Sequence, residues 1–152
     1  SSVWPRSRIR SSIKRKRCLV PADGFYEWKR EQVQPAKKSA KQPFYIHPKQ
    51  TELFAFAGIW ESWKDAEGME MKTYTIITTE PNKEMADIHN RLPVILEPDQ
   101  ESEWLNPAHN DDRAAIEALL DPYHDNGLDI YKVSSDVNSP RNNDAHLIYA
   151  LD

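Results

Sequence analysis

The sequence predicts an α+β fold, built on a curved, mainly antiparallel, barrel-like β-sheet with short helices. Short segments rich in β-branched and aromatic residues recur along the 152 residues, and eleven prolines interrupt the chain. Strands and helices intermix without the strand–helix–strand alternation of a parallel sheet. The length suits one domain, so we expect residues 1–152 to form a single domain, with residues 1–12 as a flexible basic arm.

The N-terminal part contains the first three predicted strands. Residues 18–20 begin a strand, and Asp23-Gly24 is a turn signal because glycine tolerates a positive φ. Residues 25–28 form the next strand. Residues 31–41 are polar and are expected to form an exposed hairpin loop, which leads to a short strand over residues 44–46.

The middle of the chain predicts the core of the sheet. Residues 53–60 are almost continuously apolar, which at this length indicates a strand buried on both faces. Gly58 inside this strand indicates a bulge or the close approach of another backbone. Residues 65–68 predict a turn, and the β-branched residues 73–79 predict the clearest strand of the chain.

Three short helices and two further strands follow. Pro81 and Pro98 each suit the first turn of a helix, and Asp111 and Asp112 are candidate N-caps of a third helix. The first helix is expected to run through residue 88 and end before Pro93, because the residue preceding a proline disfavours helical geometry. The remaining predicted strands cover residues 94–96 and 131–133.

Composition and charge narrow the functional classes. The single cysteine, Cys18, excludes a disulfide-stabilised scaffold, and no apolar run approaches the ~20 residues of a membrane span. No secretory signal is visible, so we expect a cytoplasmic protein of bacterial type. The net charge is −4, yet residues 1–30 carry nine Lys and Arg side chains against Asp23 and Glu27. Such a basic segment suits phosphate binding, and the alternative is a solvated terminus.

Glu27 is the first candidate for acid–base chemistry, because it lies among aromatic residues on a predicted strand. Phe25 shares its face of the strand, and Tyr26 and Trp28 point to the other face. Loss of water around the carboxylate raises its pKa, which suits a general acid or base near neutral pH. The alternative is an edge-strand carboxylate paired with a lysine or arginine.

His89 and Arg91 form the second candidate, directly after a predicted short helix. A helix C-terminus favours the charged form of histidine, and a guanidinium binds phosphate through two parallel N–H groups. The alternative is that His89 only caps the helix. The other histidines stand alone, without His-x-x-x-His or Cys-x-x-Cys spacing, so we expect no metal and no cofactor.

Six runs of the sequence occur together in one order. They are residues 17–29 (RCLVPADGFYEWK), 54–60 (FAFAGIW), 75–79 (TIITT) with Asn82, 88–96 (IHNRLPVIL), Trp104-Leu105 and 133–138. This set resembles the SRAP family, the SOS response-associated peptidases, over residues 13–150. The resemblance implies a compact α+β domain on a curved antiparallel sheet, with Glu27 and His89 as catalytic residues.

The resemblance also implies a reaction. Family members protect abasic sites in single-stranded DNA by crosslinking to them, after autopeptidase removal of the initiator Met exposes an N-terminal cysteine. The α-amine of that cysteine condenses with the abasic aldehyde to an imine, and its thiolate closes a thiazolidine. Glu27 would move protons in these lyase-type steps, and His89 would hydrogen-bond or protonate the sugar oxygen. DNA contacts are expected from Arg6, Arg8, Arg10, Arg17 and Arg91 to phosphates, and from Tyr26 or Trp28 to bases.

The sequence departs from the family at its start. It begins with Ser1, and the family's leading part, including its cysteine, does not appear. We therefore expect an N-terminally incomplete SRAP-type domain that is inactive alone, since Cys18 has an amide nitrogen and cannot form a thiazolidine. The expected partner is single-stranded DNA with abasic sites, bound by a monomer at the nucleoid. The alternatives are a non-catalytic single-stranded DNA-binding module and an inactive remnant of the fold.

Overall fold

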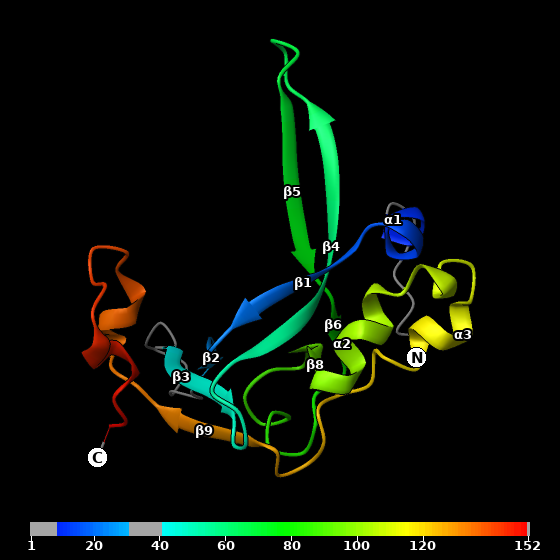
Figure 1. The fold of residues 1–152 in the computed structure, drawn as a ribbon. Helices are drawn as coiled ribbons and strands as arrows, with labels where there is room; N and C mark the ends of the chain where they lie inside the picture. Colours follow the sequence, from blue (N-terminus) through cyan, green and yellow to red (C-terminus); the bar gives the residue numbers. More distant parts are fainter. Residues whose placement is uncertain (1–8, 31–40, 152) are drawn as a thin grey trace.

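Antiparallel strand pairs form the framework of the chain in a computed structural model, which describes residues 9–30 and 41–151 (Figure 1). The strands are β1 (Arg17–Ala22), β2 (Phe25–Arg30), β3 (Lys41–Pro48), β4 (Phe54–Lys64), β5 (Glu70–Ile76), β6 (Thr78–Thr79), β7 (Leu92–Pro93), β8 (Ile95–Leu96) and β9 (Leu128–Lys132). The helices are α1 (Ile9–Arg15), α2 (Pro98–Leu105) and α3 (Arg113–Glu117), with 3-10 turns at Pro107–His109, Ser135–Asn138 and Ala145–Ile148. The α+β prediction with a mainly antiparallel sheet is confirmed, and the described sheets do not close into a barrel.

β4 is the central strand, as its apolar sequence predicts. It pairs with β1, β5 and β8, and its first six residues are buried. Because side chains alternate along a strand, Phe54 and Phe56 enter one apolar cluster while Ala57 and Ile59 enter a second cluster on the opposite face. Gly58 allows the close approach of β1, since a Cβ there would lie 3.0 Å from the Cys18 sulfur.

The three α-helices cover one face of this sheet, and the sheet of β2, β3 and β9 covers the other (Figure 1). α2 begins as predicted with Pro98 in its first turn, and Asp112 caps α3 by accepting a hydrogen bond from the Ala115 amide at 3.1 Å. Trp104 of α2 is fully buried, and its Nε1 donates to the Cys18 carbonyl at 2.9 Å. Among the described residues, no helix is long and apolar enough to cross a membrane.

Two predicted segments differ from the structure. Residues 9–12, expected within a flexible arm, form the first part of α1, because Ile13 buries completely against the helix-side cluster. Residues 83–88, expected as a short helix, form consecutive turns instead. Arg6, Arg8 and residues 31–40 of the predicted loop over residues 31–41 lie outside the described part of the chain, and Lys41 begins β3.

Candidate functional site

β2 places Glu27 on the face that looks toward the core. Phe25 packs edge-on against Phe56 with ring centroids 5.5 Å apart, and Glu27 shares its face two residues further along. The turn before β2 requires Gly24, because a Cβ there would lie 2.1 Å from the Tyr45 hydroxyl. The backbone at Gly24 does not adopt a positive φ, so close contact and not φ is the reason for glycine.

Side-chain hydrogen bonds from Asn82 and Glu84 hold the turns that lead to His89. Asn82 Oδ1 accepts from the Met85 backbone amide at 3.1 Å, and Asn82 Nδ2 donates to the Tyr123 carbonyl at 3.1 Å. The Glu84 carboxylate accepts from the Leu128 amide at 3.1 Å. Sequence reasoning assigned no positioning role to Asn82 and Glu84. The sequence offered Asn82 only as part of the runs that carry the family resemblance, and it offered no signal for Glu84.

The structure brings Glu27 and His89 together, as their assignment to one site requires. His89 Nε2 lies 3.9 Å from Glu27 Oε2, and the Glu27 side chain is 22% exposed. This separation exceeds a hydrogen bond, so both atoms retain the capacity to bind a third group between them. His89 Nδ1 lies 3.1 Å from the Arg91 carbonyl and 3.2 Å from its amide, so the backbone of Arg91 fixes the ring.

Burial raises the pKa of Glu27 above its ordinary value. The charge of His89 and a backbone hydrogen bond at Trp28 act in the opposite direction and lower this pKa, but the effect of burial is larger. The Glu27 carboxylate is therefore a stronger base than an ordinary glutamate, because burial among neighbours such as Phe25 disfavours its charged form.

Arg91 lies beside His89 and contacts Thr78 of β6. Its Nε donates to the Thr78 hydroxyl at 3.2 Å, and one terminal nitrogen donates to the Thr78 carbonyl at 2.7 Å. β6 follows β5 after the single residue Ile77, and this segment positions the guanidinium. Thr78 is a residue that sequence reasoning did not select, because a threonine in a β-branched strand carries no distinguishing signal.

Tyr26 and Trp28 lie across β2 from Glu27, as the alternation of the strand predicts. Tyr26 packs on Tyr45 with ring centroids 5.4 Å apart, and Trp28 Nε1 donates to the Asn138 side chain at 2.7 Å. Both aromatic rings are half-buried. Tyr26 and Trp28 therefore lie next to Glu27 along β2, but on the opposite face of the strand.

Arg17 is buried among backbone carbonyls and does not join the other candidates. Its guanidinium donates to the carbonyl oxygens of Trp104, Ile13, Lys14 and Asn106, and to the Asn110 side chain. Burial lowers its pKa from the ordinary arginine value. These contacts give Arg17 a structural role in joining α1 to the end of α2.

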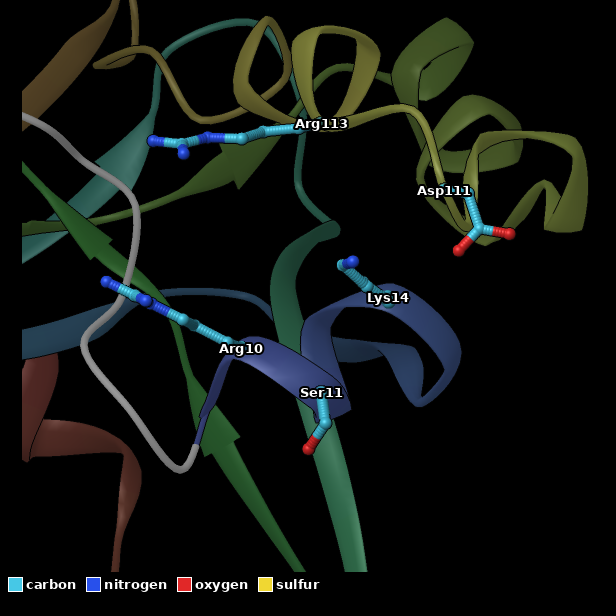
Figure 2. Close-up of a pocket in the computed structure, with 5 residues that line it drawn as sticks. All are labelled: Arg10, Ser11, Lys14, Asp111 and Arg113. Carbon is cyan, nitrogen blue, oxygen red and sulfur yellow. The ribbon is translucent and has the colours of Figure 1, made fainter.

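Arg10 lies in α1, apart from the Glu27–His89 pair. It lines a surface cavity of about 400 Å³ together with Ser11, Lys14, Asp111 and Arg113 (Figure 2). Figure 2 shows the α1 residues of this cavity across from those at the start of α3. Within residues 9–30 and 41–151, no three His, Cys, Asp or Glu side chains gather closely enough to hold a metal ion.

Comparison with known proteins identifies the family. The family model for SOS response associated peptidase (SRAP) matches residues 2–140. The abasic site processing protein YoqW of Bacillus subtilis is 50% identical over 140 residues, which are 92% of this chain and 60% of that protein. The abasic site processing protein HMCES of Gallus gallus is 36% identical over 150 residues, covering 86% of this chain and 42% of that protein.

Solved structures agree with this result. A crystal structure of a protein from Bacteroides thetaiotaomicron has a TM-score of 0.86 at 32% identity, and covers 98% of this chain and 62% of that one. A phage-related protein from Bordetella bronchiseptica has a TM-score of 0.62 at 35% identity, over 83% of this chain and 57% of that one. The chain spans about 60% of the length of the first relatives that it matches. With its sequence runs, its fold and these matches in agreement, the chain belongs to the SRAP family.

Proposed function

We propose that this chain supplies the acid–base and DNA-holding part of a protein that processes abasic sites in single-stranded DNA by crosslinking to them. The observation that carries the proposal is the approach of Glu27 and His89 to 3.9 Å on the inner face of β2, with the pKa of Glu27 raised by burial. The names of the relatives, abasic site processing proteins, support the same substrate.

In this proposal the two side chains handle protons around the sugar of the abasic site. His89 hydrogen-bonds or protonates the sugar ring oxygen as the ring opens, and Glu27 accepts the proton released from the sugar hydroxyl. The resulting aldehyde condenses with an N-terminal cysteine amine, releasing water and leaving an imine. The cysteine thiolate then adds to the imine carbon, and the nitrogen takes up one proton as the thiazolidine closes.

Arg91 would hold a phosphate next to the reacting sugar. Its contacts with Thr78 direct the guanidinium from the same segment that carries His89. Tyr26 and Trp28 lie on the other face of β2. They would contact bases only where the bound DNA strand passes around the edge of the β-sheet. Arg17 is left out of the proposal, because carbonyl and amide oxygens of the protein already accept its hydrogen bonds.

The test is crosslinking by the full-length protein that contains this chain. Single-stranded DNA carrying one abasic site is incubated with the protein, and the covalent adduct is followed over time on a denaturing gel. If Glu27 moves protons in the rate-determining steps, Glu27→Gln slows adduct formation by a factor on the order of 10²–10⁴.

The matched control is Glu52→Gln, which changes an exposed glutamate elsewhere on the chain and is expected to leave the rate unchanged. An adduct that forms at the wild-type rate with Glu27→Gln would falsify the assignment of Glu27. An adduct absent from the wild-type protein would instead favour the alternative of a non-catalytic DNA-binding module.

A further inference from the structure

The β4–β5 hairpin extends beyond the strands that support it. β1 pairs with β4 only from Phe54 to Ile59, so beyond Trp60 the two strands of the hairpin pair with each other alone. Figure 1 shows this ribbon projecting clear of the other elements. A two-stranded ribbon is marginally stable on its own, and exposed aromatic side chains on it indicate a contact surface.

One face of the ribbon combines aromatic rings with lysines. Strand pairing places Trp60 opposite Tyr74, and the Trp60 amide donates to the Lys16 carbonyl at 2.9 Å, so the three residues form a row across the sheet. The Lys16 ammonium lies 5.3 Å from the Trp60 ring centroid and the Lys72 ammonium 5.6 Å from it. Tyr74 is the open ring of the row, with 65% of its surface exposed. We name these four residues, Lys16, Trp60, Lys72 and Tyr74, the ribbon face.

The ribbon face and the candidate site are connected through β5. Tyr74 and Ile76 point to the same side of β5, and Ile76 packs against the same apolar cluster as Phe25 of β2. Thr78, two residues further along, binds Arg91. Four residues of extended strand span about 13 Å, so Tyr74 lies roughly that far along the chain from the Arg91 contact.

We propose that the ribbon face binds the single-stranded DNA that flanks the abasic site. Lysines that contact phosphates and an aromatic ring that stacks on a base are the two contacts by which proteins hold single strands without sequence preference. The choice of DNA as the polymer rests on the proposed function. The turn at the end of the hairpin carries Asp65 and Glu67. Glu70 begins β5 two residues before Lys72, and its carboxylate accepts from the Ser62 hydroxyl at 2.7 Å, so the carboxylates set the outer limit of the surface there.

The test measures equilibrium binding of undamaged DNA, separately from crosslinking. Fluorescence anisotropy of a labelled oligothymidine strand is recorded with the full-length protein at several salt concentrations. Tyr74→Ala is expected to weaken binding roughly 5- to 150-fold, the range for loss of one stacked base, while Tyr74→Phe retains the ring and the affinity. Replacing Lys16 and Lys72 together by Ala is expected to make the plot of log affinity against log salt less steep. Each lost phosphate contact lowers the magnitude of its slope by about 0.7, so two lost contacts lower it by about 1.4.

The control variant lies on the opposite face of the same ribbon. Trp63 pairs with Met71 there and is half exposed, so Trp63→Ala removes a comparable ring without touching the ribbon face. Its affinity for the strand is expected to equal that of the wild type. Unchanged affinity with Tyr74→Ala overturns the proposal, and so does an equal loss with Trp63→Ala.

The outcomes for the two proposals remain distinguishable. If the ribbon face is wrong, Tyr74→Ala binds undamaged DNA as the wild type does, whatever the crosslinking gel shows. If the proposed crosslinking is wrong, the abasic strand gives no adduct, while the loss of affinity with Tyr74→Ala persists.

Discussion

Replacing Arg17 by methionine tests the structural role of this buried cation against the DNA-binding role that its sequence context suggests. Arg17 is only 9% exposed and donates hydrogen bonds to five oxygen atoms of the protein. Methionine retains most of the aliphatic volume and removes all five donors. The substitution therefore isolates the guanidinium contacts from the packing of the side chain.

The expected loss of stability follows from the acceptors that remain. The carbonyl oxygens of Trp104 and Ile13 are bonded to Arg17 in buried surroundings, and each costs about 1–3 kcal/mol when it loses its donor. The other three acceptors are partly exposed and regain hydrogen bonds to water. For the two buried carbonyls together we expect a loss of about 2–6 kcal/mol. For a chain of this size that corresponds to a fall in Tm of roughly 4–24 °C.

Urea unfolding followed by tryptophan fluorescence measures this loss, because Trp104 lies against the Arg17 guanidinium at 5.6 Å. The control is Arg15→Met, since Arg15 is exposed in its 3.6 Å contact with Asp111 and its loss is expected to change stability by no more than about 0.5 kcal/mol. The structural role of Arg17 is refuted if the free energy of unfolding of Arg17→Met lies within about 1 kcal/mol of the wild-type value. It is also refuted if the folded variant loses affinity for DNA.

Two further predictions concern titration and an unsatisfied hydroxyl. Because burial raises the pKa of Glu27, the folded chain holds this proton more tightly than the unfolded chain, so the contribution of Glu27 to stability falls as the pH rises from the ordinary carboxyl range through the raised pKa. Glu27→Gln should thus gain stability relative to the wild type as the pH rises over that interval, measured by urea unfolding at each pH. A difference in the free energy of unfolding that stays constant with pH would contradict the raised pKa. Thr79 is fully buried and its hydroxyl has no hydrogen-bond partner among the described residues, so Thr79→Val should raise the free energy of unfolding by about 1 kcal/mol. An unchanged or lower urea midpoint would show that the hydroxyl is satisfied in solution.

The local pattern of apolar and polar residues predicted those strands whose burial is determined by their own sequence. The continuous apolar run at residues 53–60 predicted a strand buried on both faces, and β4 is that strand. The prediction of a helix over residues 83–88 was wrong, because a contact with a distant part of the chain overrides the local preference of this segment. Asn82 bonds to the Tyr123 carbonyl, and this contact favours the compact turns that place Met85 in the core.

The site was predictable where strand alternation decides the direction of a side chain. The two faces of β2 separate Glu27 from Tyr26 and Trp28 as the sequence requires. Arg17 was not predictable in this way, since a basic run with Lys14 and Lys16 indicates a solvated segment. Its burial depends on carbonyl groups near residues 104–110, which no local pattern connects to it.

The register of β2 on β3 decides whether Glu27 has a functional environment at all. Glu27 pairs with Phe44 and faces the core, whereas Tyr26 pairs with Tyr45 on the outer face. A slip of one residue would exchange the two faces and move Glu27 away from His89. Gly24 helps to prevent that slip, because the space that its missing side chain leaves is filled by the Tyr45 ring. The raised pKa of Glu27 and its 3.9 Å approach to His89 therefore both depend on a contact at the turn, three residues before the carboxylate in the sequence.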